Sequence, residues 1–239
     1  MKKSIKKFLW GALDIAVIIG VVVLIRTFVI SPVSVLGESM KSTLENGDLI
    51  LVDKLSYRLS SPKRGDIIVF YPPIEKYTRQ TGLLCLGYKA LAVIKGEKTA
   101  DACRVRELFV KRVIGLPGDT VEIFNGDVFV TPSGGQKQKV RDDFLDTPNQ
   151  HQTCIPAPTC IGGNMSRHFF FSVPENAVFA IGDNRRGSYD SREWREHGQA
   201  VPFVPFKNIL GKVRVVFWPL GDFHLFSSKP LLETAQKNP

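Results

Sequence analysis

Three polar segments of the chain contain residue types that can do chemistry. They are GESMKSTLENGD (37–48), FVKRVIGLPGD (109–119) and GDNRRGSYDSR (182–192). A serine such as Ser39 is a weak nucleophile and needs a neighbouring base to remove its proton. The chain has no GxSxG elbow, and no histidine stands in a recognisable triad context. Lysine is the other common base for such a serine.

Strand alternation in the second segment predicts an unusual environment for a lysine. If residues 107–115 form a strand, Phe109, Lys111 and Val113 share one face and Arg112 lies on the other. We expect Lys111 to point into an apolar setting and Arg112 to point to solvent. A free lysine has a pKa of about 10.4, and burial disfavours its charged form. A shift to about 7–8 costs roughly 3–5 kcal/mol and makes the amine usable as a base near neutral pH.

Together, the three segments resemble the signature blocks of bacterial type I signal peptidases (leader peptidases), a family of Ser–Lys dyad serine proteases. The resemblance covers most of residues 31–220 and is strongest in the third segment. The residues there that fit the family pattern are Gly182, Asp183, Asn184, Arg185, Ser188, Asp190, Ser191 and Arg192. The resemblance implies a serine endopeptidase in which Ser39 attacks the scissile carbonyl while Lys111 takes its proton. It also implies that no metal or organic cofactor is needed.

The resemblance assigns supporting roles to the third segment. Ser188 would hydrogen-bond the Lys111 amine and orient it. Asp190 and Arg192 would pair and hold the loop in shape. Taken without the resemblance, the same stretch is a polar loop with an ion pair.

Two positions in the first segment depart from the family pattern. The oxyanion hole would use the Ser39 backbone N–H and a donor two residues earlier, where this chain has Gly37 and some members have a hydroxyl residue. Such a site relies on backbone donors alone or on a group that the sequence does not identify. Ser42 stands where the family motif usually has proline.

The implied substrates are exported preproteins, from which the enzyme would remove N-terminal signal peptides with small residues in an A-x-A pattern before the cleaved bond. We expect the substrate to lie as an extended strand beside residues 67–70 and beside the segment before Ser39, with main-chain hydrogen bonds to both. The expected substrate-binding residues are Val35, Leu36, Met40, Ile67, Val69 and Phe109. Trp218 either touches the membrane surface or belongs to the core.

Residues 8–30 form the one long apolar stretch of the sequence, and a membrane span needs about 20 such residues. Its two charged residues, Asp14 and Arg26, lie toward opposite ends, where both can reach the interface. Four lysines precede the stretch and only Lys41 follows it closely; the four are Lys2, Lys3, Lys6 and Lys7. We therefore expect a single-pass cell-membrane protein with a cytoplasmic N-terminus and a catalytic domain on the outer face.

A cleavable signal peptide is the alternative to this anchor, because it also begins with a basic region and an apolar run. The apolar run here is longer than the run of a typical signal peptide. The sequence that follows it, SPVSVLGES, has no A-x-A-like cleavage site. Both observations favour an uncleaved anchor.

After the apolar stretch, turn residues recur before short apolar runs, a pattern typical of strands and hairpins. The runs are NGDLILV (46–52), RGDIIVF (64–70), PGDTVEI (117–123) and NGDVFV (125–130), with further strands expected at 107–115, 176–181 and 209–218. We therefore expect a mainly β catalytic domain over residues 31–220, between an anchor (1–30) and a C-terminal tail (221–239). Two stretches without clean alternation, about 73–105 and 131–170, are interpreted as insertions.

The four cysteines, Cys85, Cys103, Cys154 and Cys160, all fall on the predicted outer side, where disulfides can form. Four cysteines allow three pairings, and we favour Cys154–Cys160, which would close a short loop that contains proline. A metal site is not expected, because no CxxC occurs and the histidines are scattered, at His151, His168, His197 and His224.

The net charge of +9 is spread along the chain, without a basic stripe that carries interleaved aromatic residues. This pattern argues against a nucleic-acid partner. A positive surface beside anionic membrane lipid is the better interpretation.

Three other functions are compatible with parts of the sequence. Self-cleaving repressor-type proteases share the Ser–Lys dyad, but they begin with a DNA-binding domain. Penicillin-binding serine enzymes use an S-x-x-K motif, and SSPK (60–63) fits it, but no K-T-G follows. A membrane-tethered β domain that binds preproteins without cutting them is the alternative outside the enzymes. The presence of both Ser39 and Lys111 argues against it.

Overall fold

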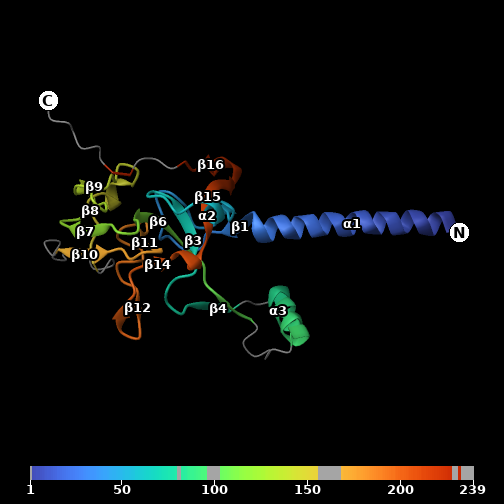
Figure 1. Cartoon of the computed structure of the whole chain (residues 1–239). Helices are drawn as coiled ribbons and strands as arrows, with labels where there is room; N and C mark the ends of the chain where they lie inside the picture. The colour runs from blue at the N-terminus through green and yellow to red at the C-terminus, as the bar shows by residue number, and fades with distance from the viewer. Residues whose placement is uncertain (1, 80–81, 96–102, 156–167, 228–230, 233–239) are drawn as a thin grey trace.

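The computed structural model describes residues 2–79, 82–95, 103–155, 168–227 and 231–232 (Figure 1). A long N-terminal helix, α1 (Lys2–Phe28), stands out from a domain built mainly of strands (Figure 1). Its window Trp10–Phe28 has a mean hydropathy of 2.2 and is 0% buried inside the structure. The predicted apolar stretch is therefore a helix that is long and apolar enough to cross a membrane.

The main sheet has eight strands, in the order β1-β2-β15-β3-β6-β11-β14, with β16 paired to β15. Its strands are β1 (Ile30–Ser34), β2 (Leu49–Asp53), β3 (Ile67–Phe70), β6 (Phe109–Gly115), β11 (Ala177–Ile181), β14 (Val204–Pro205), β15 (Ile209–Trp218) and β16 (His224–Leu225). All the described pairings are antiparallel. β1 forms one edge of this order, whereas β3 lies inside it between β15 and β6.

A second sheet of four strands, in the order β10-β7-β8-β9, extends the domain away from α1 (Figure 1). Its strands are β7 (Thr120–Phe124), β8 (Asp127–Thr131), β9 (Gln138–Lys139) and β10 (Phe169–Ser172). Asn125 and Gly126 join β7 to β8, with φ values of 52° and 83°. Positive φ at both turn residues is what an Asn-Gly hairpin requires, because its twist then matches that of the strands.

The core is apolar and divides into three packed clusters, which the two sheets share. Ile114 and Phe179 belong to the first cluster, Val52 and Val69 to the second, and Trp194 to the third. All seven segments that were expected to form strands contain one. The prediction of a mainly β fold is confirmed.

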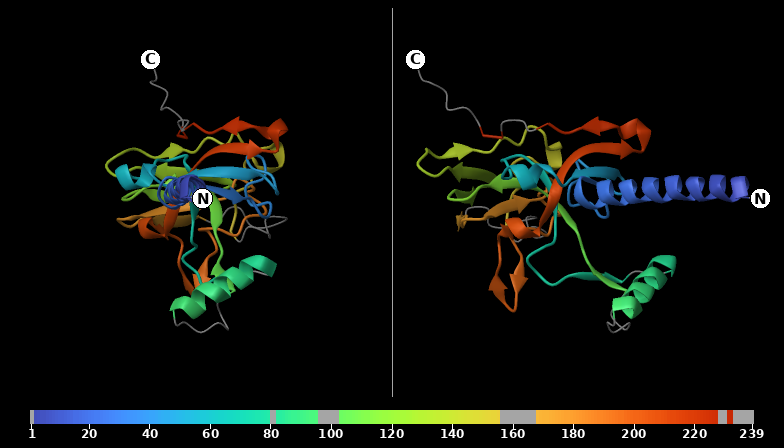
Figure 2. Two further views of the ribbon diagram at one scale, coloured as in Figure 1. Left: turned by 90° about the vertical axis from the view of Figure 1, so that its right-hand side faces the viewer. Right: turned by 45° about the vertical axis from the view of Figure 1, so that its right-hand side comes forward.

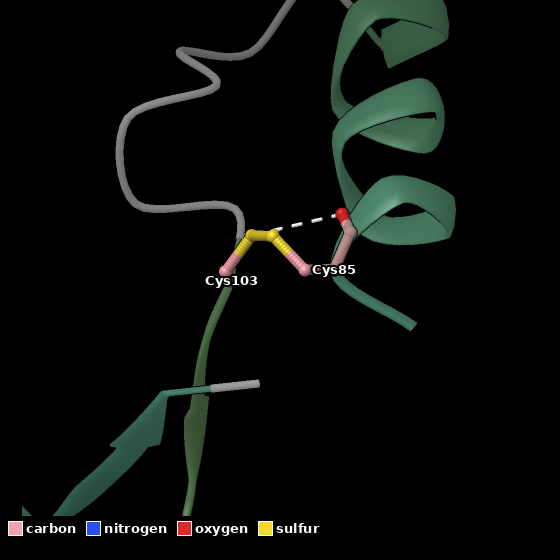
Figure 3. The surroundings of a disulfide bond; sticks show 2 residues. All are labelled: Cys85 and Cys103. Carbon is pink, nitrogen blue, oxygen red and sulfur yellow. Dashed lines mark hydrogen bonds between the residues drawn. A yellow bond between two sulfur atoms is a disulfide. The ribbon is translucent and has the colours of Figure 1, made fainter. Parts of the chain in front are cut away.

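The first predicted insertion forms a projecting arm. Strands β4 (Tyr77–Arg79) and β5 (Arg104–Arg106) pair with each other, and helix α3 (Gly82–Lys95) lies beyond them. A disulfide between Cys85 and Cys103, with a Cα–Cα distance of 5.0 Å, ties α3 to the start of β5 (Figure 3). We call β4, α3 and β5 together the arm.

The second pair of cysteines lies in the second predicted insertion. Cys154 is disulfide-bonded. Cys160 lies outside the described residues, as does part of the second predicted insertion. The Cys154–Cys160 pairing therefore stays a prediction.

The predicted C-terminal tail contributes to the folded domain. Its strand β16 pairs with β15, and Leu231 is buried in the first core cluster. The remaining short elements connect strands. They are α2 (Ser56–Leu59), η1 (Thr147–Asn149), β12 (Arg195–Glu196), β13 (Gln199–Ala200), η3 (Phe206–Asn208) and η4 (Leu220–Asp222).

Candidate active site

The folded chain brings Ser39 and Lys111 into direct contact. Ser39 lies in the connection between β1 and β2, and Lys111 lies in the middle of β6, opposite Ile68 of β3. Lys111 Nζ donates a hydrogen bond to Ser39 Oγ at 2.7 Å and another to the Val110 carbonyl at 3.0 Å. An amine at this distance can take the hydroxyl proton once it has lost one of its own.

Lys111 is buried, with 3% of its surface exposed, although it carries an ionisable amine. The ring centroid of Phe109 lies 5.1 Å from its Nζ. Burial is the main cause that lowers the pKa of Lys111 to about 8, and the charges of Arg192 and Lys76 act in the same direction. The carboxylates of Asp190 and Asp183 oppose this shift without cancelling it. The predicted apolar setting of Lys111 is confirmed.

Arg112 does not point to solvent, so this part of the sequence prediction is wrong. Its guanidinium forms an ion pair with the buried Asp183 at 2.7 Å and also donates to the Gly65 carbonyl at 3.1 Å. Thr43 Oγ1 donates to the same carboxylate at 2.6 Å. A buried carboxylate needs such partners, because an unpaired one would be costly to desolvate. Asp183 thereby joins β6 to the connection that contains Ser39.

The third segment also fixes the backbone around Ser39. The Asn184 N–H donates to the Ser39 carbonyl at 3.1 Å, and its side chain donates to the Glu38 carbonyl at 3.0 Å. Gly182 packs so closely that an added Cβ would lie 2.3 Å from the Ser39 carbonyl oxygen and 2.2 Å from Ser188 Oγ. Only glycine fits there without moving the backbone of Ser39.

The expected pair of Asp190 and Arg192 is present and fully buried. Arg192 donates two hydrogen bonds of 2.8 Å each to the Asp190 carboxylate, a bidentate geometry that suits a guanidinium. Burial alone would raise the pKa of Asp190, but Arg192 and the Gly182 N–H hold it below its ordinary value. Arg192 also donates to the Arg185 carbonyl at 2.8 Å. The pair therefore holds this loop in shape.

The expected hydrogen bond between Ser188 and Lys111 is not formed. Ser188 is buried, and its Oγ forms no hydrogen bond of normal geometry with the described residues, although it is one of the groups that lower the pKa of the neighbouring Asp190. Its position beside Gly182 nevertheless places it next to the Ser39 backbone.

The expected oxyanion-hole donors differ in their availability. The Gly37 N–H donates to the Asn46 side chain at 2.9 Å, with Gly37 at a φ of 92°. The Ser39 N–H has no hydrogen-bond partner within the described part of the chain. At Ser42 the backbone has a φ of 91°, which proline cannot adopt.

A cleft of about 550 Å³ opens beside the Ser39–Lys111 pair. Of the expected substrate-binding residues, Leu36 and Phe109 line it, and Leu36 is 85% exposed. The other four, Val35, Met40, Ile67 and Val69, are buried in the second core cluster, so their assignment as pocket walls is corrected. They alternate with exposed positions or lie in an inner strand, and their side chains fill the core.

The expected pairing of a substrate beside residues 67–70 is also corrected. These residues form β3, whose two sides are already hydrogen-bonded to β15 and β6. β1, which precedes Ser39, is an edge strand in the main sheet. Its residues Val33 and Ser34 line the cleft, so this half of the expectation agrees with the structure.

Sequence reasoning missed the wall of the cleft that faces β1. The arm and its base supply that wall, and Tyr189 of the third segment completes it. The additional lining residues are Lys76, Thr78, Val105, Arg106, Glu107 and Leu108. The signal available in the sequence was the short runs YTR and RVR, which pair as β4 and β5. The Cys85–Cys103 disulfide joins α3 to β5, and the sequence does not select this cysteine pair.

One group of described residues has the composition of a metal site. Ligand atoms of Asp127, Asp142 and His151 lie within 4.8 Å of one another. His151 Nδ1 already contacts Asp127 at 2.6 Å, and the Lys139 ammonium pairs with the same carboxylate at 2.9 Å. This group lies at β8, in the second sheet, and has no contact with the Ser39–Lys111 pair.

The amino-acid sequence of the chain is similar to those of known proteins. Residues 9–218 match the family described as signal peptidase, peptidase S26. The chain belongs to this family. It is 34% identical over 197 residues to signal peptidase I of Leptolyngbya laminosa, which covers 82% of this chain and 73% of that protein. It is 32% identical over 217 residues to probable signal peptidase I-1 of Synechocystis sp., with 88% and 86% covered.

A crystal structure of signal peptidase I from Enterococcus faecalis V583 matches 64% of this chain and 97% of its own, at 23% identity and a TM-score of 0.35. Family membership makes this chain a serine endopeptidase of the signal peptidase I type.

Burial of the Lys111 amine predicts a measurable cost in stability. The folded pKa is about 8, whereas an unfolded lysine has about 10.4, so the unfolded chain binds more protons between these values and stability rises with pH there. At pH 7 the full cost, about 3 kcal/mol, is present. Lys111→Met removes this cost and loses the two hydrogen bonds of the amine, each worth about 1 kcal/mol, so we expect a net gain of about 1 kcal/mol.

Denaturant unfolding of the full chain in detergent, at pH 7 and pH 10.5, measures this difference. At pH 10.5 the gain should be lost, because the folded amine is then neutral and about half of the unfolded chains have lost the proton as well, so little of the cost remains. The account of a buried charge is contradicted if Lys111→Met is less stable than the unaltered chain at pH 7. It is also contradicted if the substitution changes the free energy of unfolding by the same amount at both pH values.

The tight packing at Gly182 predicts that a single methyl group disturbs the site. Gly182→Ala must push back the Ser39 carbonyl, and misplacement of a reacting group by about 1 Å can cost about 100-fold in rate. We expect kcat/KM to fall at least about tenfold. Gly221→Ala is the control, because an added Cβ there meets nothing within 4 Å. Equal activity of both variants would show that Gly182 does not position Ser39.

Proposed function

We propose that this chain is a membrane-anchored signal peptidase that cleaves N-terminal signal peptides from exported preproteins, with Ser39 as nucleophile and Lys111 as general base. One observation carries the proposal: the buried Lys111 amine, with a lowered pKa, lies 2.7 Å from Ser39 Oγ beside an open cleft. The names of the similar proteins from Leptolyngbya laminosa and Synechocystis sp. support the substrate class.

In the proposed reaction, neutral Lys111 takes the proton of the Ser39 hydroxyl while Oγ bonds to the scissile carbonyl carbon. The resulting ammonium returns a proton to the leaving amine as the peptide bond breaks. An ester then joins the signal peptide to Ser39. The same amine next removes a proton from water, whose oxygen bonds to the ester carbonyl carbon. As the bond from that carbon to Ser39 Oγ breaks, the Lys111 ammonium returns the proton to Oγ, and the signal peptide leaves with a free carboxyl group.

The lowered pKa decides whether this reaction can run near neutral pH. With a pKa of about 8, roughly one tenth of the Lys111 amine is neutral at pH 7. An ordinary lysine would be neutral in only about one molecule in 2,500. Burial therefore raises the population of the competent base by about two orders of magnitude.

The negative charge that develops on the carbonyl oxygen needs hydrogen-bond donors. The Ser39 N–H is our first candidate, because it has no other partner within the described residues. The Gly37 N–H can serve only after its hydrogen bond to Asn46 breaks. Asp183, Asp190 and Arg192 act as positioning residues, since they hold the loops around the pair and do not touch the cleft.

The substrate would lie extended between the edge strand β1 and the segment that leads into β6. Leu36 and Phe109 line this cleft from its two sides, and Tyr189 lies at one end of the lining. An edge strand offers unpaired main-chain groups, so it can bind any sequence in extended form. Side-chain selection then falls to the small pockets along the cleft.

The membrane attachment would use α1 as a single span with a cytoplasmic N-terminus. Trp218 is 54% exposed and so is not a core residue, which favours the membrane-surface alternative for it. Leu220 and Phe223 follow it and are exposed as well. Exposed tryptophan and apolar residues are suited to the headgroup region of a bilayer.

The dyad predicts a specific pattern of inactive variants. Ser39→Ala, Lys111→Ala and the double variant should each lose at least about 1,000-fold in preprotein cleavage, because the two groups act as one unit. Lys111→Arg should be equally inactive, since a guanidinium stays charged. His151→Gln, His168→Gln, His197→Gln and His224→Gln are the controls. The mechanism would be contradicted if one of these histidine variants lost activity while keeping its fold, or if Ser39→Ala kept substantial activity.

The proposed orientation predicts which side of the membrane carries the domain. Protease added outside intact spheroplasts should digest residues 31–239 and leave the lysine-rich N-terminus protected. The measurement is immunoblotting with tags at each end of the chain. Protection of the C-terminal tag, with digestion after the cells are lysed, would reverse the orientation.

A further inference from the structure

The arm places α3 on the same side of the β domain as the membrane anchor. In Figure 1 and in the right view of Figure 2, α3 lies outside the β domain, apart from α1 and level with the end of α1 that joins β1. The left view of Figure 2 looks along α1 and shows α3 lengthwise. The axis of α3 therefore crosses that of α1. If α1 spans a bilayer, α3 lies in the plane of its surface.

α3 exposes more apolar surface than a helix in water should. Leu86, Leu91, Val93 and Ile94 are each between 46% and 81% exposed. They follow one another within 9 residues of the sequence GLLCLGYKALAVIK. Isolated exposed apolar residues are ordinary, but a contiguous group of them marks an interaction surface.

These residues occupy one side of the helix. At 3.6 residues per turn, an arc of about 160° contains only apolar residues and glycine. By sequence the arc holds, in order around the helix, Val93, Leu86, Ala90, Leu83, Ile94, Gly87 and Leu91. Lys89 and Lys95 lie just outside its two borders, and Tyr88 lies beside Lys95.

The opposite side of α3 faces the rest of the arm. It carries Ala92, which is buried, and Cys85, whose disulfide to Cys103 joins the helix to β5 (Figure 3). Because this side is attached to the protein, the apolar arc points away from it. The arc is thus held outward by a covalent link.

The observations favour lipid as the occupant of this arc. α3 lies crosswise to the anchor, on the same side of the β domain, which is the geometry of a helix in a membrane–water interface. Lysines at both borders can extend to headgroups while their stems stay in contact with apolar material. A tyrosine at the border is likewise suited to this depth.

We propose that α3 lies at the outer surface of the membrane that α1 spans, in the interface between lipid and water, with its apolar arc among the acyl chains. In this position it would hold the wall of the active-site cleft that the arm supplies at the lipid surface. This inference rests on the proposed membrane anchorage through α1. The class of ligand is phospholipid, including anionic headgroups near Lys89 and Lys95.

The link from α3 to the cleft runs through the two arm strands. Thr78 of β4 and Arg106 of β5 line the cleft, as do Lys76 and Glu107 at the base of the arm. Thr78 Oγ1 donates to Glu107 at 2.7 Å, and Lys76 pairs with Glu107 at 3.2 Å. The same short hairpin therefore carries the lipid-binding helix at one end and a cleft wall at the other. A substrate that emerges from the bilayer would therefore contact this wall of the cleft at a constant distance from the membrane surface.

Photocrosslinking of the full chain in phosphatidylethanolamine–phosphatidylglycerol vesicles tests the location of α3. A benzoylphenylalanine replaces Ile94 in one variant, Val22 of α1 in a second and Phe170 in a third. Phe170 is exposed on β10, at the far end of the domain from α1, so it is the matched control (Figure 1). We expect lipid adducts at Val22 and Ile94, with a yield at Ile94 at least about tenfold above that at Phe170.

The other outcomes overturn different claims. Adducts at Val22 without adducts at Ile94 overturn the role of α3 and leave the anchor intact. Absence of adducts at Val22 overturns the anchorage itself. A crosslink from Ile94 to a second copy of the chain, in place of lipid, shows that α3 is a protein interface.

A charge variant tests the consequence for the cleft. Val93→Glu with Ile94→Glu should reduce cleavage of a preprotein inserted in the same vesicles at least about fivefold, because carboxylates are costly at that depth. Cleavage of a short soluble peptide should stay within about twofold of the unaltered enzyme, since the dyad is untouched. Phe170→Glu should change neither. An equal loss with both substrates, or no loss with either, would contradict the proposed coupling.

Discussion

The contact between a desolvated amine and a serine hydroxyl is the constraint on which the rest of the structure depends. Lys111 must be sufficiently buried from water to lose its proton near neutral pH. Its Nζ must nevertheless reach Ser39 at the edge of an open cleft. A central strand provides the first condition, because its neighbours on both sides exclude water. A loop that enters from β1 provides the second. Neither element alone creates a base and a nucleophile.

The charges around Ser39 and Lys111 are paired in a way that keeps the pKa of Lys111 low. Free carboxylates near Lys111 would raise its pKa again, as Asp183 and Asp190 tend to do. Each of these carboxylates is matched by a guanidinium, from Arg112 and Arg192 respectively. The Arg112–Asp183 ion pair and the hydrogen bond from Thr43 to Asp183 join the three segments, and little net charge is left beside the amine. The resulting burial of Lys111 lowers stability and makes the chemistry possible.

The sequence could predict much of the fold, because turn residues before alternating apolar runs are local signals that identify strands. The same alternation predicted the burial of Lys111. It could not predict that Arg112 binds Asp183, which lies 71 residues away, or that β3 is an inner strand, because its neighbour β15 comes from the far end of the chain. The arm was interpreted as an insertion, since its strands are only three residues long each and the sequence does not select the disulfide between Cys85 and Cys103. Local patterns identify elements, whereas long-range pairings decide which surfaces line the cleft.

Direct titration of the Lys111 side chain tests the central claim. The full chain, labelled with 13Cε-lysine, can be followed by NMR in detergent from pH 6 to 11, and the Lys111 signal can be assigned by its absence in Lys111→Met. We expect a midpoint of about 8, which should persist in Ser39→Ala because burial and not the hydroxyl is its main cause. A midpoint of about 10.4 would contradict the account, since Lys111 would then be an ordinary charged lysine at neutral pH.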